Sequence, residues 1–102
     1  NHPESEFVAR FIGGHNVIAK NGAKFAVRAD KVELKRKSKS GMAVTVREIE
    51  FQGVRFSLKL TADGQKELSA EIDDKTFFNK PFEIGESAFL TWKPEDAHSL
   101  AA

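Results

Sequence analysis

The chain has 102 residues, 40% of them hydrophobic, which fits one compact domain and leaves no second core. Sixteen basic and fifteen acidic residues give a formal net charge of +1, so no whole-molecule field attracts nucleic acid or anionic lipid. Cysteine is absent, which excludes disulfides, thiolate metal sites and cysteine nucleophiles. Because no apolar run approaches the ~18 residues of a spanning helix and no charged-then-apolar leader opens the chain, we expect a soluble or peripheral protein.

The first residues carry a helical pattern. Residues 3–12 place Phe7, Val8, Phe11 and Ile12 on one face, and Gly13-Gly14 ends the pattern. An isolated helix of this length is marginal in water, so its apolar stripe must dock on the following domain or on a partner. The chain begins at Asn1 instead of Met, and we expect it to be cut from a longer protein. We therefore divide it into a linker helix over residues 1–14 and a domain over residues 15–102.

After Gly14 the pattern alternates with the period of β-strands. Strands are predicted over residues 16–20, 24–28, 32–35, 42–51, 54–60, 68–72 and 87–92. Asn21-Gly22 and Asp63-Gly64 predict tight turns. The alternation slips between Val46 and Ile49, which indicates a β-bulge of the kind that bends a barrel strand. The fold class is thus all-β, a small barrel of short antiparallel strands with a short N-terminal helix.

Residues 73–81 lose the alternation and are predicted to be irregular. Phe77, Phe78 and Phe82 form an aromatic-rich segment there, which serves either as a plug for one barrel mouth or as a contact surface. Residues 94–97 predict a turn or a single helical turn.

Catalytic and metal-binding patterns are missing from the sequence. There is no phosphate loop, and His2, His15 and His98 lack zinc-ligand spacing. Asp73-Asp74 is interpreted as a turn, because adjacent side chains point apart on extended backbone. We expect no catalytic residue, no cofactor and no metal in this chain.

A basic run extends from Lys31 to Lys39, and its simplest interpretation is a solvated strand end and loop. A second interpretation is an oxyanion cradle. Its candidate anion contacts are Lys35, Lys37, Ser38, Lys39 and Ser40. A third interpretation is a grip on nucleic-acid phosphates, which requires exposed aromatic side chains for base stacking. Phe25, Phe51 and Phe56 lie in the apolar phase of their strands and are predicted to be core, so no nucleic acid is expected.

Three segments, in order, resemble a known family. Residues 7–16, Phe-Val-Ala-Arg-Phe-Ile-Gly-Gly-His-Asn, resemble the segment that leaves the nucleotide-binding domain in ABC importer ATPase subunits. Residues 25–32 are similar to that family's Val-Arg-Pro-Glu motif, with Ala29 in place of Pro and Asp30 in place of Glu. Residues 92–97, Trp-Lys-Pro-Glu-Asp-Ala, are similar to its closing Trp-x-Pro-Glu-Asp-Ala. The middle strands are generic.

The resemblance implies a TOBE domain, an OB-like barrel downstream of the ATPase domain, in an importer of the spermidine/putrescine type. The chain itself is then not an enzyme, and ATP and Mg belong to the missing domain of its parent. The implied partners are the parent's nucleotide-binding domain, a second copy of the ATPase subunit in a homodimer, and indirectly the permease subunits. The implied location is cytoplasmic, peripheral to the inner membrane through the transporter.

The implied work of such a domain is to support contacts of the ATPase dimer and its regulation. The candidate contact residues are Phe7, Arg10 and Phe11 of the entry helix and Phe77, Phe78 and Phe82 of the irregular segment. A free-standing module for a molybdate-like oxyanion is the leading alternative, and a single-strand-binding barrel is the third.

Overall fold

The computed structural model describes residues 14–100, which form two antiparallel sheets with little helix. The strands are β1 (His15–Lys20), β2 (Ala23–Arg28), β3 (Val32–Lys35), β4 (Met42–Phe51), β5 (Arg55–Thr61), β6 (Leu68–Asp73), β7 (Ser87–Trp92) and β8 (Ala97–Ser99). The helical elements are α2 (Asp74–Asn79) and the 3-10 turn η1 (Pro94–Asp96). The all-β prediction is therefore confirmed, and the predicted helix over residues 3–12 lies outside the described residues.

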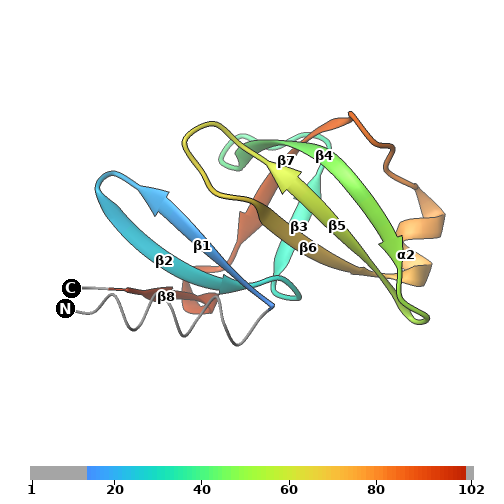
Figure 1. The fold of residues 1–102 in the computed structure, drawn as a ribbon, viewed down its shortest axis with the longest axis horizontal. Coiled ribbons are helices and arrows are strands. Elements are labelled where there is room, and N and C mark those ends of the chain that lie inside the picture. Colours follow the sequence, from blue (N-terminus) through green and yellow to red (C-terminus); the bar gives the residue numbers. More distant parts are fainter. Residues whose placement is uncertain (1–13, 101–102) are drawn as a thin grey trace.

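The larger sheet has the order β3-β7-β4-β5-β6, and the smaller has the order β1-β2-β8. Figure 1 shows the β1–β2 hairpin with β8 beside it as an arm that extends from the barrel, on the side away from α2. The larger sheet curls until Cα atoms of its two edge strands, β3 and β6, come within 8 Å of each other. The sheet thereby becomes a small barrel.

Strand β4 is long because it serves two partners. Its first residues pair with β7, and residues from Thr45 to Phe51 pair with β5. The register shifts between Val46 and Glu48, so the predicted bulge is confirmed. At the bend, Val46 donates its N–H to the carbonyl of Glu86 at 2.9 Å and accepts from Gly85 N–H at 2.7 Å. These bonds satisfy the backbone of β4 where the strand changes partner.

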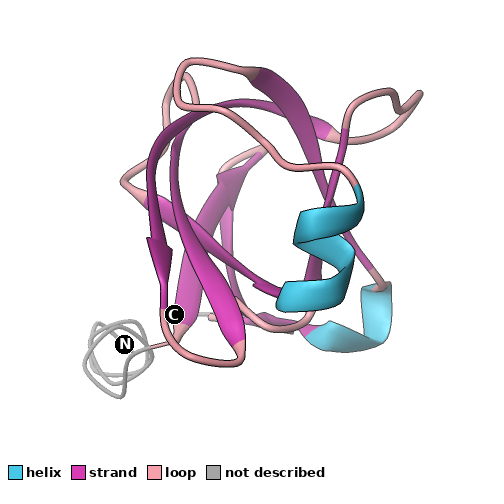
Figure 2. Ribbon diagram, turned by 90° about the vertical axis from the view of Figure 1, so that its right-hand side faces the viewer, coloured by secondary structure: helices cyan, strands magenta, loops and turns pink. Residues whose placement is uncertain are grey.

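The core fills the barrel with apolar side chains from both sheets. Its fully buried members include Ile18, Val27, Val46, Leu58, Leu60 and Leu90. In Figure 2, which views the barrel from the α2 end, the strands curve around a common axis and α2 lies at the near mouth. Phe77 of α2 is buried with this core, so the helix closes that mouth.

Two turns were predicted from dipeptides and are confirmed. Asn21 has φ 53° and Gly22 has φ 79°, the positive values that a tight hairpin turn needs, and Lys20 pairs with Ala23. Gly64, with φ 73°, lies between β5 and β6, which pair as the second predicted hairpin.

Several sequence predictions were wrong in detail. The irregular segment contains α2, because Asp73 caps a helical turn that buries Phe77. The short strand β8 was not predicted. Val54 precedes β5 in an exposed turn, and Phe51, predicted to be core, is 52% exposed because it ends β4 at the barrel mouth.

Amide side chains join the arm to the barrel. Asn16, which is buried, accepts from Ser69 N–H at 2.7 Å and donates to the carbonyl of Ser69 at 2.8 Å. Gln65 makes the same pair of bonds to the backbone of Ala19, at 2.9 Å and 2.7 Å. Each side-chain amide thus makes the two hydrogen bonds that the backbone of a paired strand would make. Together the two amides connect β1 to the start of β6 and the loop before it.

Candidate functional site

Four phenylalanines gather where α2 meets the barrel, and we call Phe51, Phe56, Phe77 and Phe78 the mouth cluster. The rings of Phe56 and Phe77 stack with centroids 3.9 Å apart, and both residues are buried. Phe78 meets Phe56 edge-on at 5.2 Å, and Phe51 lies 4.9 Å from Phe56. Such tilted and edge-on contacts are favoured by the ring quadrupoles. The cluster runs from the core to the surface.

The outer members of the mouth cluster are exposed to solvent. Phe78 is 63% exposed, Phe51 is 52% exposed, and Val54 in the adjacent turn is 68% exposed. The Asp74 N–H donates to the carbonyl of Val54 at 3.2 Å, which holds the turn against α2. These three apolar side chains form a surface that we call the apolar rim.

The start of α2 is fixed by a side-chain cap. Asp73 accepts from Thr76 N–H at 2.7 Å, which satisfies one of the free donors of the first turn. This hydrogen bond lowers the pKa of the Asp73 carboxyl below its ordinary value. The interpretation of Asp73-Asp74 as a structural turn agrees with this cap.

The predicted contact residues therefore occupy different places. Phe77 and Phe82 are buried, whereas Phe78 presents its ring to solvent. Phe7, Arg10 and Phe11 lie outside the described residues. Phe51 and Val54 were missed as candidates, because alternation placed both in the apolar phase of a strand. Only the turn between β4 and β5, which tertiary structure positions beside α2, brings them to the surface.

Arg36 holds the segment after α2 against the barrel. Its guanidinium donates to Glu86 at 2.7 Å and to the carbonyl of Pro81 at 2.6 Å. It also lies 4.0 Å from the ring centroid of Phe82, which adds a cation–π contact. The basic run thus contains an arginine with a structural role. Its contacts with Glu86, Pro81 and Phe82 hold the beginning of the loop that follows β3.

That loop borders a hollow of about 450 Å³ on the outer face of the barrel, which we call the lysine trough. The trough is lined by three lysines, three acids and several neutral side chains: Lys31, Lys35, Lys93, Asp30, Glu33, Asp96, Val32, Ser38, Ser40, Thr91 and Trp92. Three of the five candidate anion contacts, Lys35, Ser38 and Ser40, are thereby brought together. Lys37 and Lys39 do not line the trough, and Lys31, Trp92 and Lys93 were missed. The pairing of Val32 with Trp92 places these distant segments side by side.

The loop has an internal cap. The Ser38 hydroxyl accepts from Ser40 N–H at 3.2 Å and from Gly41 N–H at 3.0 Å. Gly41 lies so close to β7 that an added Cβ would come 2.8 Å from the Cβ of Phe89. The loop is consequently held on the sheet at both of these points.

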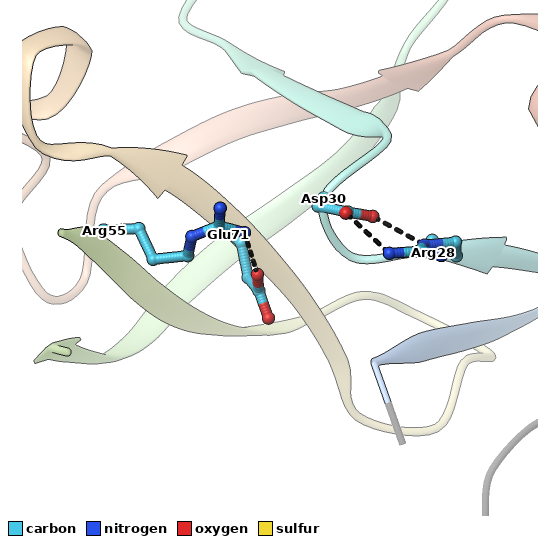
Figure 3. A network of polar contacts seen from close by, with 4 residues as sticks. All are labelled: Arg28, Asp30, Arg55 and Glu71. Carbon is cyan, nitrogen blue, oxygen red and sulfur yellow. Dashed lines mark hydrogen bonds and ion pairs between the residues drawn. The ribbon is translucent and has the colours of Figure 1, made fainter. Parts of the chain in front are cut away.

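Charged pairs surround the junction of arm and barrel. Arg28 binds both carboxylate oxygens of Asp30, at 2.9 Å and 2.8 Å, and Arg55 binds Glu71 at 2.8 Å (Figure 3). The hydrogen bond from Arg28 lowers the pKa of the Asp30 carboxyl, and the same bond raises the pKa of Arg28. Both pairs are partly exposed, so each contributes little to stability.

Between Arg28 and Asp30, Ala29 is buried and bonded through its backbone. Its N–H donates to the carbonyl of Gly14 at 2.6 Å, and its carbonyl accepts from Glu71 N–H at 2.9 Å. Proline has no N–H. The departure from the Val-Arg-Pro-Glu pattern at this position therefore adds a hydrogen bond that the usual residue could not make.

No cluster of three or more metal-ligating side chains occurs within residues 14–100. Over the same part of the chain, no helix has the length and apolar character needed to cross a bilayer.

The fold and these two surfaces define a class, a small antiparallel β-barrel module with an apolar rim at one mouth and a trough of mixed charge on its side. The chain belongs to the TOBE domain family, whose model matches residues 25–100. The predicted OB-like barrel is confirmed by this match. A TOBE domain is a non-catalytic module, which agrees with the interpretation that this chain is not itself an enzyme.

A solved structure shares the fold. It is the cytoplasmic molybdate-binding protein ModG, crystallised with molybdate bound, with a TM-score of 0.65 and 21% sequence identity. The match covers 74% of this chain and 58% of ModG, so the chain matches less than two thirds of that protein's length. No curated protein sequence matches the chain.

Proposed function

We propose that this domain is a non-catalytic accessory domain of the ATP-binding subunit of a bacterial ABC importer, where it supports dimer contacts and regulation. The family match and the three segments that resemble such subunits support this function. The observation that carries it is the apolar rim, because contiguous exposed apolar side chains on a small domain mark interaction surfaces.

The size of the rim indicates the kind of contact. A stable interface between independent proteins buries about 800 Å² on each partner. Three partly exposed side chains, Phe51, Val54 and Phe78, supply only part of that area. Such a contact suits domains that are already held together, since a tether raises the effective concentration of the partner surface.

The finer assignments rest on the resemblance. In this proposal ATP and Mg bind the nucleotide-binding domain of the parent subunit. The partners are that domain, a second copy of the subunit and, indirectly, the permease subunits. The domain itself lies on the cytoplasmic side of the inner membrane. A polyamine is the preferred cargo because the opening segment is most similar to that group. Cargo selectivity resides in the binding protein and permease and not in this domain.

The first test reads the coding sequence upstream of Asn1. A phosphate-loop motif followed by an ABC signature supports the proposal, whereas a start codon close to Asn1 contradicts it. The second test places Phe51→Ser and Phe78→Ser together in the full subunit and measures dimerisation by analytical ultracentrifugation. We expect weaker dimerisation, and Lys66→Ser, in the loop before β6, serves as the matched surface control. An unchanged dimer would remove the rim from the proposal.

The alternative function is a free-standing oxyanion-binding module. It is favoured by one observation, the convergence of Lys35, Ser38 and Ser40 on the lysine trough. Isothermal calorimetry with molybdate, tungstate and sulfate discriminates it from the accessory domain. Heat that disappears in a Lys35→Ala variant supports the alternative, and the absence of heat with all three anions excludes it.

A further inference from the structure

Another hollow lies over the first halves of β4 and β7 and the end of β5, and we call it the hydroxyl hollow. Its volume of about 620 Å³ exceeds that of the lysine trough and falls within the ~300–1,000 Å³ of small-ligand sites. Strand β4 runs from Met42, which lines the hollow, to Phe51, which belongs to the apolar rim. The hollow and the rim therefore lie at opposite ends of β4.

Three hydroxyl side chains form a row across the hollow. Thr45 of β4 pairs with Thr61 of β5 on one side and with Ser87 of β7 on the other. Directly opposed residues on neighbouring strands share one face of the sheet, with Cβ atoms ~4.5–5.5 Å apart. This face is the outer one, because Thr61 and Ser87 are exposed whereas Val44 and Val46, on either side of Thr45, are buried. The row thus places side by side three groups that both donate and accept hydrogen bonds.

Only two charged side chains line the hollow, Arg47 and Asp63, and their charges cancel. Arg47 donates through Nε to the hydroxyl of Thr61 at 2.9 Å, which places its guanidinium beside the row. Within residues 14–100, neither Arg47 nor Asp63 has an oppositely charged group within 4.0 Å. The hollow therefore offers donors at one point and acceptors at another, and no ion pair occupies them.

An aromatic side chain lies next to the hydroxyl row. Phe89 of β7 pairs with Ala43 of β4, two residues along from the pair of Ser87 with Thr45. Because side chains alternate along a strand, Phe89 and Ala43 share the outer face with the row. Phe89 is only partly buried, so its ring adds apolar surface to a hollow that is otherwise rich in polar groups.

These features favour a neutral ligand with many hydroxyl groups. An oxyanion or a nucleic acid would be opposed by Asp63, and a cationic ligand would be opposed by Arg47. A fully apolar ligand would leave the hydroxyl row and both charged groups without partners. A sugar ring carries hydroxyls that donate and accept around its edge, and C–H groups on its faces. It can therefore match the hydroxyls, the guanidinium, the carboxylate and the phenyl ring together.

We propose that the hydroxyl hollow binds a short neutral oligosaccharide. Arg47 donates to sugar hydroxyls and Asp63 accepts from them, while Thr45 and Ser87 add hydrogen bonds between these two groups. The ring of Phe89 packs against the C–H face of one sugar. This site uses neither the apolar rim nor the lysine trough, so its test is independent of the function proposed above.

The test titrates the isotope-labelled 102-residue chain with cellotriose, maltotriose and triacetylchitotriose while amide NMR spectra are recorded. We expect saturable shifts of the amides of Thr45, Thr61 and Ser87 with at least one of these sugars. The Kd should be on the order of 1 mM, because an open hollow leaves much of the ligand in water. It should change by less than about twofold between about 20 mM and about 200 mM NaCl, since salt screens charges and the sugars carry none.

Two variants locate the site. Arg47→Ala should raise the Kd about tenfold, because it removes charge-assisted hydrogen bonds. Phe89→Leu removes the ring, keeps an apolar side chain and should also weaken binding. The matched control is Lys75→Ala, which removes one exposed positive charge from α2, outside the hollow. It should bind within about twofold of the parent chain, and the dispersion of the NMR spectra verifies that each variant is folded.

The proposal is overturned if none of the sugars shifts these amides at about 20 mM, or if Arg47→Ala binds as well as Lys75→Ala. It is also overturned if sodium phosphate or a thymidine oligonucleotide saturates the same amides at lower concentration than any of the sugars. A Kd that rises about tenfold with salt would likewise contradict a neutral ligand.

Discussion

Helix α2 and the arm are attached to the barrel by different kinds of interaction. At the α2 mouth, stacked rings of Phe56 and Phe77 exclude water, and α2 is held by apolar contact. At the arm, Asn16 and Gln65 reach across to backbone groups of Ser69 and Ala19. Dispersion and burial tolerate small rotations, whereas a pair of hydrogen bonds specifies one position. The attachment of α2 at the mouth therefore depends on how well the side chains fill the available volume. The attachment of the arm depends on the alignment of β1 with the start of β6.

The largest effect is expected at the mouth. Phe77→Ala removes a buried ring and leaves a cavity beside Phe56, which should lower the free energy of unfolding by about 3–5 kcal/mol. Urea denaturation followed by circular dichroism measures it. Phe78→Ala, at a ring that is 63% exposed, is the control and should cost less than about 1 kcal/mol. Equal losses would show that the mouth is not closed by Phe77.

At the arm, Asn16→Ala removes a buried side chain and leaves the partly buried N–H and carbonyl of Ser69 without their side-chain partner. The expected loss is about 2–3 kcal/mol in the same urea experiment, because two hydrogen bonds and the packing of a buried side chain are lost together. Gln65→Ala removes the matching bonds at an exposed position and should cost less. If the order of the two losses were reversed, burial would not explain the arm's attachment.

The loop beside the trough gives a third and smaller expectation. In Gly41→Ala the new methyl group meets the Cβ of Phe89 at 2.8 Å, so the loop must shift, at a cost of about 1–2 kcal/mol. Thermal unfolding measures the loss. Gly53→Ala is an informative comparison, because its strain comes from a φ of 91° and not from a neighbouring atom. A fully stable Gly41→Ala variant would mean that the loop is not held against β7.

The smallest expected effect concerns the cap of α2. The pKa of Asp73 is lowered in the folded chain, so its stabilisation is present above the unfolded pKa of about 4 and is lost as the pH falls through the folded value. Asp73→Ala should lower the urea midpoint at pH 7, and the difference from the parent chain should shrink at about pH 2. A difference that stays constant with pH would contradict a role for the ionised carboxylate.

Local signals in the sequence were sufficient for much of the fold. Asn21-Gly22 predicts its turn because the dipeptide itself tolerates positive φ, and the slipped alternation after Val46 predicts the bulge. Helix α2 was missed because six residues carry too short a period, although Asp73 three residues before Thr76 is a capping signal. The sequence predicted only one part of the trough lining, the residues Lys35, Ser38 and Ser40. Lys93 was not predicted, because its approach depends on the pairing of β3 with β7, which no local pattern encodes.

The order of pairing also affects how the chain folds during synthesis. Strand β7 is made late, yet it pairs on one edge with β3 and on the other with the first half of β4. The β1–β2 and β5–β6 hairpins close locally, within a few residues of their turns. On the ribosome both hairpins can pair early, while β3 and the start of β4 wait with open edges for residues 87–92. A chain interrupted before Ser87 would thus expose two strand edges at once, so the pairing of β7 is the step that protects the nascent domain from self-association.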